Sequence, residues 1–190
     1  MIDRARLEAL EVLMSAGEIE RLCELASEVP RTQEIVEVGS YTGGSAAWMT
    51  TACRAHITCI DAWADLDWNG ASMVGEDVLA KFLKVVDWTA VTALRGRSVD
   101  VAQMWLKPIG LLFIDANHDY GEVRADYEAW HRHIVPGGWI VFHDYPWTPE
   151  DVSFRSEGPG RVVDEIVWPS GLWEECHLVD CLWSARRKAA

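Results

Sequence analysis

The chain has 190 residues, a length typical of one domain that can bury a sizeable core. Its 17 Lys and Arg against 30 Asp and Glu give a net charge of −13, so we expect neither nucleic acid nor a membrane surface as a partner. No apolar run approaches the ~18 residues of a membrane span, and five cysteines without a C-x-x-C pair predict reduced core residues of a cytoplasmic protein.

Short β-rich runs alternate with helical patterns along the chain. An N-terminal helical segment is expected over residues 1–30, with a helix or helix pair at 3–28, and a second helix at 46–53. Compact runs with β-branched or aromatic residues predict strands at 34–38, 57–61, 91–94, 111–115 and 139–143.

The clearest helical pattern covers residues 119–134, where apolar side chains recur at helical spacing. Asp119 and Glu122 have the spacing of a capping box at its start. Pro136-Gly137-Gly138 is expected to stop it.

Strands that are apolar on both faces and separated by helices predict a mostly parallel, Rossmann-like α/β sheet with helices on both faces, in one domain over residues 1–190. Residues 173–183 leave little room for a crossover helix and predict a closing antiparallel hairpin. Two segments rich in Gly, Pro, Trp and acid, 62–75 and 145–160, follow strand ends. Ligands of such sheets bind beyond the carboxyl ends of the strands, so both segments are candidate substrate loops.

The first strand runs into a glycine-rich turn, EVGSYTGGS at residues 37–45, and the second strand ends at Asp61. Glycine permits a sharp turn and the close approach of a ligand, and an acid at the end of the second strand can accept hydrogen bonds from ribose hydroxyls. The glycine spacing departs from the dinucleotide pattern G-x-G-x-x-G. Glu37 would repel a pyrophosphate but suits a cationic ligand, which favours a nucleoside site of another kind.

Eleven tryptophans are unusual for a chain of this length. Four of them, Trp63, Trp68, Trp147 and Trp173, fall in segments that resemble loops. An amphipathic ring in a loop either stacks on a ligand or completes the core, and the sequence leaves both readings open.

The segments EVGSYTGGS, GRSVD (residues 96–100), FIDANHDY and PGGWIVFHDY, with Asp61 between the first two, resemble the class I S-adenosylmethionine-dependent methyltransferases. More narrowly, the chain is similar over about residues 30–185 to the small metal-dependent bacterial sugar O-methyltransferases. These include the macrocin-type enzymes and mycobacterial enzymes that methylate mannose polysaccharides. The metal-dependent catechol O-methyltransferases share the same segments.

The resemblance implies that S-adenosylmethionine is the cofactor. Its methionine part would be held in the glycine-rich turn, its ribose by Asp61 and its adenine near Ser98. The cofactor-binding residues implied in this way are Glu37, Gly39, Ser40, Tyr41, Thr42, Gly43, Ser45, Asp61, Ser98 and Asp115.

The resemblance also implies a divalent metal, with Asp115, His143 and Asp144 as its ligands. Mg²⁺ is the expected ion, and the imidazole of His143, if it binds rather than only orients the site, allows Mn²⁺. The metal would orient an acceptor hydroxyl and lower its pKa. His118 stands where the catechol enzymes carry a lysine base, so His118, Asp115 and Asp144 are the expected catalytic residues.

The leading hypothesis is an O-methyltransferase acting on a hydroxyl of a saccharide or glycosylated small molecule, for example a methylated mannoside. One alternative acceptor is a catechol-like aromatic hydroxyl. A second alternative is a metal-dependent hydroxylase in which Asp115, His118 and His143 form a two-histidine, one-carboxylate iron site. A third is a cofactor-binding subunit without activity. The family also suggests a homodimer, with residues 3–28 as the candidate interface.

Overall fold

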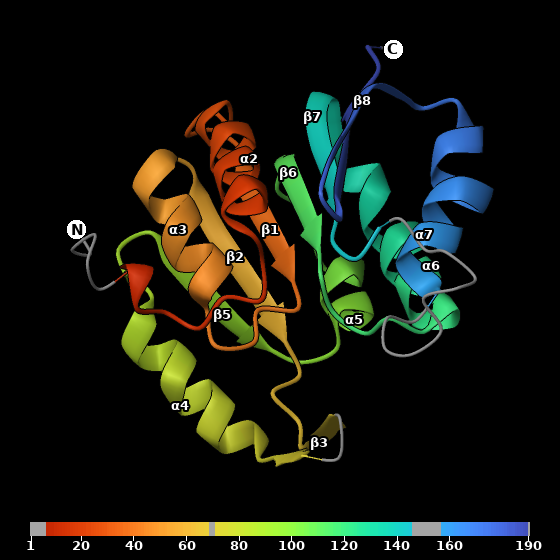
Figure 1. The fold of residues 1–190 in the computed structure, drawn as a ribbon. Coiled ribbons are helices and arrows are strands. Elements are labelled where there is room, and N and C mark those ends of the chain that lie inside the picture. The colour runs from red at the N-terminus through yellow and green to blue at the C-terminus, as the bar shows by residue number, and fades with distance from the viewer. Residues whose placement is uncertain (1–6, 69–70, 146–156, 190) are drawn as a thin grey trace.

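The computed structural model describes residues 7–68, 71–145 and 157–189. Its main strands are β1 (Glu34–Val38), β2 (His56–Asp61), β5 (Val91–Arg95), β6 (Ile109–Ile114), β7 (Ile134–Phe142), β8 (Trp173–Val179) and β9 (Leu182–Arg187). They form one seven-stranded sheet in the order β5-β2-β1-β6-β7-β9-β8 (Figure 1). The first five are parallel and β9 is antiparallel to both of its neighbours, which confirms the predicted Rossmann-like sheet and closing hairpin.

Helices cover both faces of this sheet (Figure 1). On one face lie α2 (Ala16–Ser27), α3 (Gly44–Ala52) and α4 (Gly75–Val85). On the other lie α5 (Ser98–Gln103), α6 (Tyr120–Trp130) and α7 (Gly158–Val162), followed by a π-helical turn (Val163–Val167) and a 3-10 turn (Trp168–Ser170).

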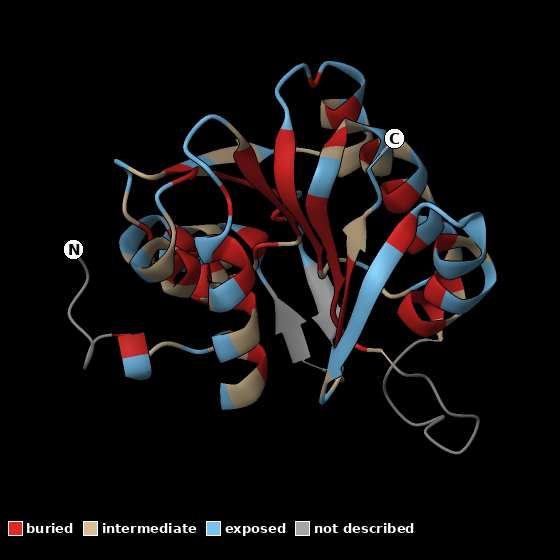
Figure 2. Cartoon of the chain, turned by 90° about the horizontal axis from the view of Figure 1, so that it is seen from above, coloured by how far each residue is buried: buried red, intermediate tan, exposed pale blue. Residues whose placement is uncertain are grey.

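Each face of the sheet has its own apolar core. Along β6, Leu111 and Phe113 pack with α2, α3 and α4, while Leu112 and Ile114 pack with α5 and α6. The central strands are therefore buried along most of their length, as their apolar sequences predict (Figure 2). Among the described residues, no helix has the length and apolar character needed to span a membrane.

The predicted helix over residues 119–134 is too long. The helix α6 ends at Trp130, a 3-10 turn covers His131–His133, and Ile134 already belongs to β7. Pro136-Gly137-Gly138 therefore lies within β7, near a register shift in its pairing with β6, and does not stop the helix. Arg187 Nη1 on β9 donates to the carbonyl oxygens of His131 (2.5 Å) and Ile134 (2.9 Å), a contact that fixes this end of the helix from far along the chain.

The predicted capping box at Asp119 and Glu122 is also wrong. The Asp119 side chain makes no capping hydrogen bond, although this residue does precede α6. A complete capping box starts α2 instead: Ser15 Oγ accepts from Glu18 N (3.2 Å), and Glu18 Oε2 accepts from Ser15 N (2.7 Å).

The two candidate substrate loops contain regular structure. Residues 62–75 include a small hairpin, β3 (Leu66–Trp68) and β4 (Ala71–Met73), before α4 begins at Gly75. Within the second segment, α7 begins at Gly158, and residues 146–156, with Trp147, lie outside the described residues.

Two of the four tryptophans singled out in loops are core residues. Trp63 and Trp173 are each only 2% exposed, and Trp173 lies on β8. The five cysteines are free, but only Cys59 is buried and Cys176 is exposed, so the prediction that all are core residues is wrong.

Candidate active site

The strand order reverses between β1 and β6, and the glycine turn and Asp115 follow these two strands at the same edge. Such a reversal is where ligands of open α/β sheets bind. Gly39 has φ +86°, and a Cβ there would lie 2.1 Å from the carbonyl oxygen of Asp115. The turn after β1 and the chain after β6 are therefore in direct backbone contact.

Asp61 is brought to the glycine turn. Its Oδ2 accepts hydrogen bonds from Ser40 N (3.0 Å) and Tyr41 N (2.9 Å), and its Oδ1 accepts from Trp63 N (2.7 Å). A carboxylate offers about four acceptor positions, so these bonds leave about one for a further donor. Tyr41 and Trp63 hold left-handed backbone conformations, at φ 44° and 40°, which side chains other than glycine seldom adopt.

Glu37 is fully buried at the end of β1. Its Oε1 accepts from Ser45 Oγ (2.5 Å), whereas Oε2 has no hydrogen-bond partner among the described residues. Burial raises the pKa of Glu37, because a carboxylate without a counter-charge is costly in the interior. A cationic group placed against Oε2 would remove this cost.

The remaining residues of the glycine-rich turn belong to the same site. Ser40 and Thr42 are buried, and Gly43 (φ +86°) caps α3. A Cβ on Gly43 would approach the ring of Phe82 to 2.8 Å, so glycine is needed at this position too.

Ser98, the first residue of α5, donates its hydroxyl hydrogen to the carboxylate of Asp126 on α6. Asp126 is 7% exposed, and burial raises its pKa to about 6, while the bond from Ser98 opposes the rise. Asp126 was not predicted from the sequence. Its position on the apolar stripe of the helix, between Val123 and Tyr127, was the available signal.

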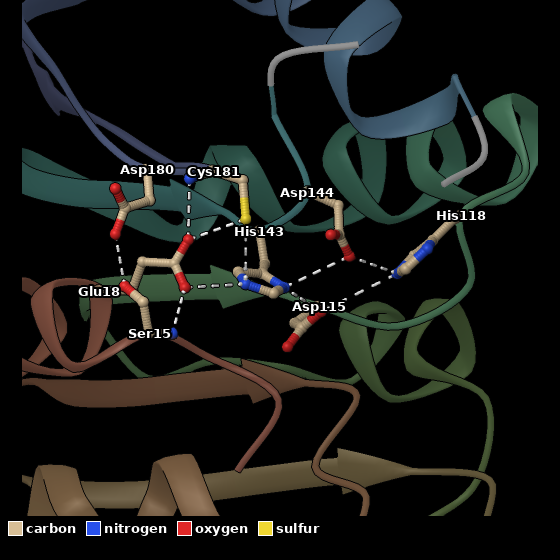
Figure 3. Close-up of polar contacts among 8 residues, drawn as sticks. All are labelled: Ser15, Glu18, Asp115, His118, His143, Asp144, Asp180 and Cys181. Carbon is tan, nitrogen blue, oxygen red and sulfur yellow. Dashed lines mark hydrogen bonds and ion pairs between the residues drawn. The ribbon is translucent and has the colours of Figure 1, made fainter. Parts of the chain in front are cut away.

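Asp115, His118 and Asp144 form a compact group at the carboxyl ends of β6 and β7 (Figure 3). His118 Nε2 lies 3.2 Å from Asp144 Oδ2 and 4.0 Å from Asp115 Oδ1. One donor atom from each residue lies within 4.8 Å of the others, and two carboxylates with one imidazole are a donor set suited to a divalent cation. Asp144 is held at φ 61° and is, after Tyr41 and Trp63, the third non-glycine residue at this edge with a left-handed backbone.

His143 lies between this group and a second one (Figure 3). Its Nδ1 is 3.3 Å from both Asp115 Oδ1 and Asp144 Oδ2, while its Nε2 faces Glu18 and Cys181. Burial of the ring disfavours protonation, but the bonds to Asp115 and Asp144 outweigh this effect and raise the pKa of His143. His118 and His143 therefore both face the carboxylates of Asp115 and Asp144.

Asp115 and Asp144 were predicted at this edge from the sequence, whereas Glu18 and Cys181 were not. The spacing Ser15-x-x-Glu18 was a signal for the helix start and gave no hint of the contact with His143. Cys181 carried no signal, because its neighbours here are distant in sequence.

A family model described as a methyltransferase domain matches residues 36–145. The chain belongs to this family. The match covers the glycine turn, Asp61, Asp115 and the His143-Asp144 pair, and it confirms the resemblance to methyltransferases.

Among sequence relatives, protein y4gI of Sinorhizobium fredii is 26% identical to this methyltransferase over 130 residues. The match covers 60% of this chain but only 13% of that relative, so the chain spans a small part of the relative's length.

Several solved structures share the fold at low sequence identity. The O-methyltransferase NovP has a TM-score of 0.70 at 16% identity, covering 94% of this chain and 82% of NovP. TomG of Streptomyces achromogenes, an O-methyltransferase of tomaymycin synthesis solved with S-adenosylmethionine, has a TM-score of 0.68 at 17% identity, covering 100% and 92%. The MycE methyltransferase of the mycinamycin pathway, solved with Mg and S-adenosylhomocysteine, has a TM-score of 0.54 at 17% identity, covering 83% and 46%.

Proposed function

We propose that this methyltransferase transfers a methyl group from S-adenosylmethionine to a hydroxyl of a saccharide or glycosylated small molecule, with the help of a divalent metal. The observation that carries the proposal is the contact of Gly39 with Asp115. This contact places the glycine-rich turn, which suits a nucleoside, beside the group of Asp115, His118 and Asp144, which suits a metal ion. Metal-assisted methyl transfer from S-adenosylmethionine requires the two sites to be adjacent in this way.

In this proposal the cofactor lies across the ends of β1, β2 and β5. Glu37 Oε2 receives the ammonium group of the methionine part, because it is a buried carboxylate oxygen that accepts no hydrogen bond from the described residues. Asp61 accepts from a ribose hydroxyl at its remaining position, and Ser98 lines the adenine pocket. The presence of S-adenosylmethionine in TomG supports the choice of cofactor.

Asp115 and Asp144 supply the anionic ligands of the metal, for which Mg²⁺ or Mn²⁺ fits the oxygen-rich set. A bound divalent cation would polarise the acceptor hydroxyl and lower its pKa. We assign His118 to accept the hydroxyl proton at Nε2, the nitrogen that faces the two carboxylates. The Mg found with MycE supports a metal here.

The saccharide part of the proposal rests on the resemblance to sugar O-methyltransferases and on the MycE structure that also holds mycinamycin VI. Trp63 and Trp173 give it no support, because both are core residues. The predicted homodimer and the cytoplasmic location stay predictions.

The hydroxylase alternative requires His118 and His143 at one iron. Among the described residues, the donor set contains His118 with two carboxylates, whereas His143 is grouped with Glu18 and Cys181. His143 Nδ1 nevertheless lies 3.3 Å from both carboxylates, so the preference for methyl transfer over hydroxylation rests on the match to the methyltransferase family.

The proposal is tested in two steps. S-adenosylhomocysteine should raise the melting temperature and NAD should not. Labelled S-adenosylmethionine is then offered with a panel of sugars, glycosides and catechols, with and without chelator. Methylation of glycosides that is lost in chelator and restored by Mg²⁺ is expected. Stabilisation by NAD alone, or full activity in excess chelator, would refute the cofactor or the metal respectively, and preference for catechols would change the acceptor.

The role of His118 is tested separately with His118→Ala. A base contributes about 10²–10⁴-fold, so kcat should fall by that factor while the affinity for Mn²⁺ is kept. A loss of Mn²⁺ affinity would instead identify His118 as a metal ligand.

A further inference from the structure

His143 is the point at which polar groups from three distant parts of the chain meet (Figure 3). On one side, Nδ1 lies 3.3 Å from both Asp115 Oδ1 and Asp144 Oδ2. On the other, Nε2 lies 3.5 Å from Glu18 Oε2 and 3.6 Å from Cys181 Sγ. The ring is 5% exposed, so its orientation depends on these neighbours.

Glu18 is itself held firmly, although it lies outside the segment that matches the family model. Its Oε2 accepts from Ser15 N (2.7 Å), and its Oε1 accepts from Cys181 N and Cys181 Sγ (2.8 Å each). Ser15 Oγ also donates to Asp180 Oδ2 (2.6 Å). The start of α2 and the turn between β8 and β9 thus clamp one carboxylate, 2% exposed, against the imidazole.

Such a clamp has a direct chemical consequence. An imidazole whose Nε2 side faces a fixed carboxylate cannot rotate without losing that contact, so Nδ1 stays aimed at the two acids beyond it. Groups that orient metal ligands in this way change metal affinity by about 10–100-fold.

We propose that Glu18 is a positioning residue of the methyl-transfer site. It fixes the ring of His143, and His143 in turn holds Asp115 and Asp144 in the arrangement that binds the divalent cation. This inference rests on the metal site of the proposed function, and it adds the N-terminal helix and the C-terminal hairpin to the parts of the chain that build that site.

Glu18, His143 and Cys181 also offer donor atoms within 4.8 Å of one another, which is a possible zinc set. Both oxygens of Glu18, however, already accept backbone N–H bonds from Ser15 and Cys181. We therefore assign the cluster to hydrogen bonding, and the stoichiometry of metal binding checks this assignment.

The test measures Mn²⁺ binding to the whole protein by calorimetry and by the spin-resonance signal of free Mn²⁺, without cofactor or acceptor. Glu18→Gln keeps the size of the side chain and an amide oxygen for the capping box. We expect it to weaken Mn²⁺ binding by about 10-fold or more. Glu28→Gln is the matched control, because Glu28 follows the same helix and accepts from Trp139 Nε1 on β7 (3.0 Å), but beside a cavity of about 220 Å³ at the opposite edge of the sheet. It should leave Mn²⁺ binding unchanged.

A double-mutant cycle separates positioning from a general effect on folding. His143→Asn keeps an N–H near the place of Nδ1 but no longer reaches Glu18. In that background Glu18→Gln should cost less than about twofold in Mn²⁺ affinity, because the two residues act in series. Equal losses in both backgrounds would overturn the proposal.

A second variant guards against misfolding of Glu18→Gln. Cys181→Ala removes one donor to Glu18 and the thiol beside Nε2, and should weaken Mn²⁺ binding by roughly threefold. Cys176→Ala, at an exposed cysteine of the same hairpin, should not.

The outcomes are distinct. Absence of Mn²⁺ binding to the unaltered protein overturns both the metal site and the role of Glu18. Normal Mn²⁺ binding that Glu18→Gln and Cys181→Ala leave unchanged overturns the role of Glu18 alone. A second bound ion that both variants remove overturns it as well, since Glu18 would then be a ligand.

Discussion

Gly39, in the turn after β1, has both a left-handed backbone and a carbonyl oxygen where its side chain would start. Each of these features alone disfavours any other residue. Three neighbours of the site, Tyr41, Trp63 and Asp144, share the left-handed conformation without being glycine. Backbone strain of this kind is found at functional sites, where the surrounding fold imposes it.

The substitution Gly39→Ala should therefore be destabilising. The added Cβ would meet Asp115 and the backbone would remain strained, so we expect a loss of about 2–4 kcal/mol in the free energy of unfolding, measured by urea titration. Gly96→Ala is the control, because no heavy atom lies within 4 Å of a Cβ built there. Equal stability of the two variants would contradict this reading of the turn.

Asp126 gives the folded protein a specific pH dependence. Its pKa is about 6, above the ordinary value of 3.8, because of burial; Glu122 adds to the rise, while Ser98 and Arg97 oppose it. Between these two values the folded protein binds more protons than the unfolded chain. Its free energy of unfolding must therefore fall as the pH rises through that window.

Asp126→Asn should remove this decline, since the amide stays neutral and its oxygen can still accept from Ser98. We expect the variant to be more stable than the parent by roughly 1–3 kcal/mol above the window. Urea unfolding at a series of pH values measures this, with Asp100→Asn as the control at an exposed neighbouring acid. A variant less stable than the parent at neutral pH would refute the assignment.

The helix α2 depends on its first turn more than its composition suggests. Ser15 caps the helix and also contacts Asp180 on the hairpin, so one hydroxyl serves both local and tertiary structure. Ser15→Ala should cost about 1–2 kcal/mol in unfolding free energy. Ser27→Ala, at the exposed other end of α2, should cost less than about 0.5 kcal/mol.

The strands were predictable because burial on both faces imposes an apolar run with little ambiguity. The strand β1 matches its predicted bounds, and β2 begins one residue before its predicted start. The end of α6 was not predictable, because Arg187 sets it through hydrogen bonds from the far end of the chain. The hairpin β3–β4 escaped prediction because each of its strands has only three residues.

The residues of the candidate site likewise fall into those that could be predicted from the sequence and those that could not. Asp61, Asp115 and Asp144 could be placed together because the carboxyl ends of parallel strands meet at one edge. The contacts on the far side of His143 could not be foreseen, since Glu18 and Cys181 reach this ring from distant parts of the chain.

The net charge of −13 should give the whole protein a negative electrostatic potential that attracts the cationic cofactor. S-adenosylmethionine carries one more positive charge than S-adenosylhomocysteine. Low salt should therefore favour the binding of S-adenosylmethionine over that of S-adenosylhomocysteine. We expect this preference, measured as a ratio of Kd values by calorimetry, to shrink as salt rises from about 0.01 M to about 1 M, because the Debye length shortens from about 30 Å to about 3 Å. A ratio independent of salt would mean that contacts in the pocket alone discriminate between the two.

The distribution of the groups around His143 along the chain also bears on how the protein is made. The ribosome delivers Glu18 early, Asp115 and Asp144 much later, and Cys181 last of all. While the hairpin is still inside the exit tunnel, the imidazole lacks one of its neighbours and its orientation is incompletely set. A nascent chain at that stage should bind metal ions poorly, and full binding capacity should arrive only once the hairpin has left the tunnel and joined the sheet.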